Sequence, residues 1–128
     1  MVLGKGVGSM PDDIFAERVA KVRQRFVSSL GEKIDTTYAA LPGLGGTEPP
    51  AAAAVAEAYR CIHGIVGIGR TVGFPEIGTA AHSVEDVLQP PYHAGRGLTD
   101  DEISLLKTSL QTLRDVASRE LQSSSPSH

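Results

Sequence analysis

The chain of 128 residues contains no tryptophan, one cysteine and few aromatic residues of any kind. Each of these shortages excludes some kinds of core or cross-link. A core with so few large rings must be filled by Ala, Val, Leu and Ile, which suits packed helices. A single cysteine, Cys61, excludes an internal disulfide, so the fold does not depend on an oxidising compartment. The sequence also lacks a run of about 18 apolar residues and a signal-peptide pattern in residues 1–10. We therefore expect a cytoplasmic protein without membrane contact.

Charge and motif content exclude several further classes. The net charge of −3 gives no clustered basic surface for nucleic acid. The four histidines have no ligand-like spacing and Cys61 falls on an apolar helix stripe, so neither a metal site nor a cofactor is expected. No G-x-S-x-G motif of a serine hydrolase is present.

Apolar residues do recur at three- and four-residue intervals in four segments, the pattern of amphipathic helices. These segments are 12–41, 51–72, 75–89 and 99–121. Because short connections favour antiparallel neighbours, we predict an all-α, antiparallel four-helix bundle over residues 12–121. Residues 1–11 and 122–128 are predicted to be disordered.

Glycine and proline residues mark the loops and helix ends between these segments. Residues 42–50 form a loop rich in both, and Gly73 is placed to end the second helix in a left-handed conformation. Pro90 and Pro91 are expected to stop the third helix. Thr99 followed by Glu102 is a capping box that starts the fourth. Gly31 is expected to bend or break the first.

One histidine stands on the polar side of the otherwise apolar second helix. At about 100° of rotation per residue, one stripe of that helix holds Ala54, Ala58, Cys61, Ile62, Ile65, Ile68 and Val72. His63 points roughly opposite to this stripe. Tyr59, Gly67 and Arg70 share its face, and Val66 lies on the flank. The absence of a side chain at Gly67 leaves room for a large group to approach the imidazole.

The order His63, Gly67, Gly73 and then Phe74-Pro75 resembles the HPt (histidine-containing phosphotransfer) domain. That family's usual signature is H-x-x-K-G-x-x-x-x-x-G on the second helix of a four-helix bundle, and the resemblance spans most of residues 12–121. The family's lysine position is Val66 here, so its usual charge is missing. We expect Arg70, two turns from His63, to substitute in part by folding its side chain back toward the imidazole.

The resemblance implies a phosphorelay intermediate of a two-component system. His63 would accept a phosphoryl group from the aspartate of one receiver domain and pass it to another, as a phosphocarrier rather than a turnover enzyme. The implied partners are response-regulator receiver domains and a hybrid histidine kinase, and we expect the protein to be a monomer. Mg²⁺ would come from the receiver, because no Asp or Glu lies within one turn of His63 on its own face.

Two other interpretations stay open at this point. With Val66 in place of lysine, an apolar patch of Val66 and Tyr59 beside His63 predicts a docking module that binds a receiver or kinase domain without carrying phosphate. The glycines of residues 65–73 also have the spacing of a nucleotide-binding turn. That second interpretation lacks the flanking strands and the uninterrupted helix that such a turn requires.

Overall fold

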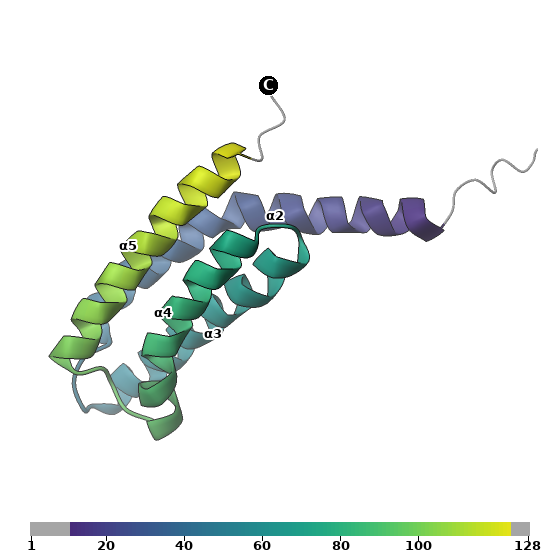
Figure 1. Cartoon of the computed structure of the whole chain (residues 1–128). Coiled ribbons are helices and arrows are strands. Elements are labelled where there is room, and N and C mark those ends of the chain that lie inside the picture. Colours follow the sequence, from purple (N-terminus) through teal and green to yellow (C-terminus); the bar gives the residue numbers. More distant parts are fainter. Residues whose placement is uncertain (1–10, 124–128) are drawn as a thin grey trace, which may run out of the picture.

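The computed structural model describes residues 11–123, which form four long helices with short connections (Figure 1). The helices are α2 (Pro11–Ala40), α3 (Pro49–Thr71), α4 (Pro75–Ala94) and α5 (Asp100–Ser123), and a single 3₁₀ turn, η1 (Leu41–Gly43), follows α2. The described residues contain no strand, only an isolated bridge between Gly45 and Leu98. The prediction of an all-α four-helix bundle is confirmed.

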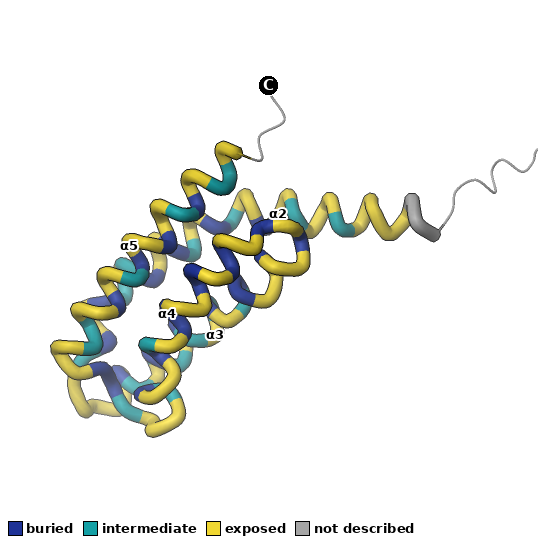
Figure 2. The backbone as a smooth tube through the Cα atoms, viewed as in Figure 1, coloured by how far each residue is buried: buried dark blue, intermediate teal, exposed yellow. Residues whose placement is uncertain are grey.

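The core lies where the apolar stripes of the helices meet, and Figure 2 shows the buried positions on the inward faces. The largest fully buried side chains are mainly Leu and Ile, contributed by every helix. Full burial of such a side chain is worth about 1.5–3 kcal/mol. Members include Leu30, Leu44, Ile62, Ile65, Ile77, Leu88, Leu106, Leu110 and Leu113.

α3 and α4 form the most extensive pair and run antiparallel. His63 in α3 contacts Glu85 in α4. Further along α3, Arg70 lies against Gly78, which comes earlier in α4. This register fixes which side chains of the two helices share the seam between them.

α4 continues through Pro90 and Pro91 to Ala94, so the prediction that these prolines stop the helix is wrong. Each proline removes one backbone donor, but Pro91 is buried in the bundle. Beyond it, Gly95 adopts a left-handed conformation (φ 68°), and its N–H binds the Tyr92 carbonyl at 3.2 Å. The chain therefore ends the helix with a capping turn at Gly95, and Tyr92 lies in the last turn of α4 instead of in the predicted loop.

Other boundaries follow the sequence more closely. α2 continues through Gly31 without a break, although Figure 1 shows its direction change along its length. Gly73 has the predicted left-handed conformation (φ 98°) after α3. In the capping box, the Thr99 N–H donates to Glu102 Oε1 at 2.9 Å and the Glu102 N–H donates to Thr99 Oγ1 at 3.2 Å.

The structure describes only a small part of the two ends that are predicted to be disordered. α2 begins at Pro11 and α5 continues to Ser123, so residues 11, 122 and 123 belong to helices and not to disordered ends. Residues 1–10 and 124–128 lie outside the described residues, and disorder there stays a prediction.

Among the described helices, α3 has the length and mean hydropathy that a membrane crossing requires. The same helix supplies a large part of the bundle core, including Val55, Ile62 and Ile65, none of which is exposed. A core helix of this kind meets the same criteria of length and composition.

Candidate functional site

His63 stands in the middle of α3 with its imidazole mostly open to solvent. Its side chain is 67% exposed, whereas Glu85, its partner on α4, is 9% exposed. The His63 Nδ1 atom contacts Glu85 Oε2 directly. A carboxylate is an acceptor, so in the neutral imidazole the proton lies on Nδ1 and is donated to Glu85. The lone pair is then on Nε2, where it is available to an electrophile.

Glu85 is a residue of the site that the sequence analysis missed. The sequence places no Asp or Glu within one turn of His63 on its own face of α3, and Glu85 reaches the imidazole from α4 instead. A signal was present in the sequence: Glu85 falls within the apolar stripe of α4, between Ala81 and Leu88. A glutamate is almost never buried without a partner, so its position predicts a cation or donor on the facing helix.

One aromatic ring stacks on the imidazole, and two more rings pack against that one. The Tyr59 ring stacks on His63 with centroids 5.7 Å apart and planes 14° apart. Tyr59 also stacks on Tyr92 of α4, with centroids 4.2 Å apart and planes 10° apart. His93 is tilted against both tyrosines, at 6.4 Å from Tyr59 and 5.3 Å from Tyr92. Burial, followed by the nearby Glu85 carboxylate, raises the pKa of Tyr59 above its ordinary value of 10.0, so its hydroxyl is protonated at neutral pH.

Val66 and Gly67, both predicted to lie near His63, differ in solvent exposure. Val66 is 7% exposed, so the predicted exposed apolar patch is wrong at this residue. The reason is rotational: Val66 lies about 60° around the helix from His63, on the side that packs in the bundle. Gly67 is exposed, and a Cβ added there would meet nothing within 4 Å. The surface one turn beyond the imidazole is therefore open, as predicted.

The apolar stripe of α3 is rotated slightly from the predicted one. Ile68, expected in the core, is 37% exposed. Cys61 is half-buried rather than enclosed. Val66 lies further inward, and Ile68 further outward, than predicted because α3 packs most extensively against α4.

Arg70 extends across the seam onto α4. A Cβ built at Gly78 would lie 2.6 Å from Arg70 Cγ and 3.3 Å from its Nε, so the absence of a side chain at Gly78 makes room for the arginine stem. The Arg70 stem therefore packs against α4, and a contribution of its guanidinium at His63 stays a prediction. On α4, His82 Nδ1 lies 3.4 Å from Asp86 Oδ2. The described residues hold no cluster of three or more potential metal ligands.

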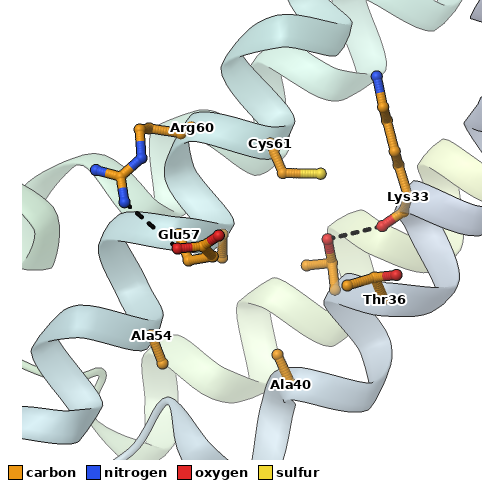
Figure 3. A pocket seen from close by; sticks show the side chains of 9 residues that line it. Lys33, Thr36, Ala40, Ala54, Glu57, Arg60 and Cys61 are labelled. Atoms are coloured by element: carbon orange, nitrogen blue, oxygen red, sulfur yellow. Dashed lines mark hydrogen bonds and ion pairs between the residues drawn. The ribbon is translucent and has the colours of Figure 1, made fainter.

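A separate apolar cleft of about 500 Å³ opens between α2 and α3 (Figure 3). Cys61, at its edge, is about 200° around α3 from His63, so the cleft faces away from the imidazole. Two of its lining residues, Arg60 and Glu57, form an ion pair at 3.4 Å. The cleft is lined by Lys33, Thr36, Thr37, Ala40, Ala54, Glu57, Ala58, Arg60 and Cys61.

A family model matches most of the chain. The family model described as Hpt domain matches residues 21–116. The matched range includes the whole of α3 and α4, and with them His63 and Glu85. No curated protein and no solved structure matched the chain.

Proposed function

The chain belongs to the Hpt domain family, whose members take part in phosphorelay signalling, and on this premise we propose that His63 is its phosphoryl acceptor. The donor is the phosphorylated aspartate of one receiver domain, and the final acceptor is the aspartate of another. The observation that supports this most strongly is the pairing of an exposed imidazole with a buried carboxylate at its Nδ1 atom.

The transfer is a displacement at phosphorus. The Nε2 lone pair of neutral His63 forms the N–P bond while the bond between phosphorus and the aspartate oxygen breaks, and the electron pair of that bond leaves with the aspartate carboxylate. Nδ1 keeps its proton, so the phosphorylated ring carries a positive charge. Transfer to the second receiver reverses these steps.

Glu85 has two roles in this scheme. Its acceptor oxygen holds the proton on Nδ1 and so keeps the lone pair on Nε2 in the ground state. Its negative charge also balances the positive charge that develops on the ring, which is stabilisation of the transition state and of the phosphorylated product. The first role needs only an acceptor, whereas the second needs the charge.

Charge compensation for the phosphoryl oxygens comes mainly from the partner. Val66, at the family's lysine position, is buried and apolar, and the stem of Arg70 packs over Gly78. The acidic site of the receiver would supply Mg²⁺. The open surface at Gly67 allows that site to approach Nε2 closely. In this proposal the chain is a cytoplasmic, monomeric carrier with no turnover of its own.

Labelling with a phosphorylated receiver tests the proposal. Incubation with a ³²P-labelled receiver should transfer an acid-labile label to the wild-type chain, and His63→Gln should abolish transfer while the circular dichroism spectrum stays helical. Labelling that persists in the variant would place the acceptor elsewhere. Stable binding of receivers or of a kinase domain without any labelling would instead favour the docking module.

A further inference from the structure

A row of stacked rings leads from His63 to the C-terminal turn of α4. Tyr59 stacks with two rings: its centroid lies 5.7 Å from that of His63 and 4.2 Å from that of Tyr92. All three planes are within 14° of their neighbours. We propose that Tyr92, acting through Tyr59, is a positioning residue that fixes the plane of the His63 imidazole for phosphoryl transfer. This inference rests on the proposed function.

The imidazole needs a second support because Glu85 constrains it at one point only. The contact joins a single ring atom, Nδ1, to one carboxylate oxygen. Rotation of the ring about that contact would leave the hydrogen bond intact while it moved Nε2 away from the line of attack. The side chain is 67% exposed, so few other contacts oppose this rotation. A flat ring stacked on the imidazole face opposes it directly.

Tyr59 can serve as this flat support only if its own rotamer is fixed. It lies one turn before His63 on the same helix and is half-buried. Tyr92 stacks on it with the shortest centroid distance of the row, and this contact restricts the rotation of the Tyr59 ring. Since Tyr92 belongs to α4, as Glu85 does, one helix constrains the imidazole of the other at two places: at Nδ1 directly and at the ring plane through Tyr59.

The course of α4 makes this contact available. Were the helix to stop at Pro90, Tyr92 would be in a loop without a defined position. Pro91 is buried instead, and the Arg96 N–H binds its carbonyl at 3.1 Å. This capping turn fixes the last turn of α4 and with it the Tyr92 ring. His93 is tilted by more than 50° against both tyrosines, so it lies beside the row and is not a member of the stack.

Four variants of the full chain test the proposal. Tyr92→Ala removes the ring, Tyr92→Leu keeps apolar volume without a flat face, and Tyr92→Phe keeps the face without the hydroxyl. The matched control is Tyr38→Ala, because Tyr38 is a half-buried tyrosine that stacks under Arg114 on the far pair of helices. Two quantities are measured: the single-turnover rate of transfer from a ³²P-labelled receiver, and the ¹⁵N and ¹³C NMR signals of the His63 ring in the free protein.

We expect transfer to slow about threefold to tenfold in Tyr92→Ala and Tyr92→Leu, the change in population that loss of one stacked aromatic pair implies. The His63 ring signals should shift or broaden in both. Tyr92→Phe should restore both readouts, and Tyr38→Ala should leave them unchanged. Wild-type rates and wild-type His63 signals in Tyr92→Leu would overturn the proposal, as would a slow transfer with unchanged signals, since Tyr92 would then contact only the receiver. Failure of the wild-type chain to accept label would refute the proposed function instead, and the NMR comparison would still decide whether Tyr92 fixes the ring.

Discussion

Replacement of Glu85 by glutamine separates the two roles proposed for this side chain. The amide has nearly the same shape as the carboxylate, and its oxygen can still accept the proton on His63 Nδ1. The tautomer is therefore retained while the negative charge is lost. Asp86→Asn is the matched control, because it removes an equal charge from the next residue of α4, whose 59% exposed side chain pairs with His82 and not with His63.

The expected magnitude follows from the geometry of the pair. Two unit charges about 4 Å apart attract by about 4 kcal/mol at the effective dielectric constant of a protein surface. The His63 side chain is 67% exposed, so solvent screening reduces this value substantially. Charge-assisted hydrogen bonds contribute about 1.5–3 kcal/mol. Since about 1.4 kcal/mol is a factor of ten in rate, Glu85→Gln should slow transfer by roughly 10- to 100-fold.

The assay is single-turnover transfer from a saturating, phosphorylated receiver, with the lifetime of the phosphohistidine measured in parallel. Transfer should slow in Glu85→Gln and stay within about twofold of wild type in Asp86→Asn. The charge argument fails if Glu85→Gln transfers at the wild-type rate. It fails equally if both variants slow to the same extent, because the effect would then come from the net charge of the surface and not from the contact with Nδ1.

Three other outcomes follow from contacts around the site and the helix ends. Gly67→Gln should block transfer sterically while the Tm stays equal or rises, because nothing lies within 4 Å of an added Cβ and glycine costs a helix interior up to about 1 kcal/mol; normal transfer in this variant would show that the receiver docks elsewhere. Gly78→Ala should lower the free energy of unfolding in urea by about 1–3 kcal/mol, because the new Cβ meets the Arg70 stem. Gly78→Ala should cost less stability when it is made in an Arg70→Ala background. Equal losses with and without the Arg70 side chain would refute the contact. The hydrogen bond from Arg96 lowers the pKa of Glu102 from 4.5 to about 2. The stabilisation that the Glu102 carboxylate gives the fold is therefore complete above pH 4.5 and is lost as the pH falls toward 2. Glu102→Gln should be less stable than wild type at pH 6 and equal to it near pH 2, and a stability difference that does not change with pH would contradict this.

Local patterns in the sequence were enough to predict the helices and the exposed face of His63. The apolar spacing, the capping box at Thr99 and the glycine at position 73 act within a few residues, and the structure has all three. The end of α4 was mispredicted for a physical reason: proline was judged by its missing donor, whereas burial of Pro91 and the cap at Gly95 decide the outcome. Neither contribution is local to the proline.

The predicted site was less complete because its second half comes from another helix. Helical rotation alone placed Tyr59 and Gly67 beside His63 correctly, but it could not say which flank of α3 packs on α4. Val66 was therefore expected to be exposed, and it is buried. Glu85 contacts the imidazole and Tyr92 contacts Tyr59, the ring stacked on it. Both contacts depend on the antiparallel register of α3 and α4, which cannot be predicted from the sequence pattern of one helix.

The central claim is that Nε2 of His63 forms the bond to phosphorus, and NMR of the phosphorylated chain tests it most directly. A phosphoryl group on Nε2 lies three bonds from both carbon-bound ring protons, Hδ2 and Hε1, whereas one on Nδ1 lies three bonds from Hε1 alone. After transfer from a phosphorylated receiver, ¹H–³¹P correlation should therefore show couplings to both protons of the His63 ring. Coupling to Hε1 alone, or a phosphorus signal that persists in His63→Gln, would contradict the account.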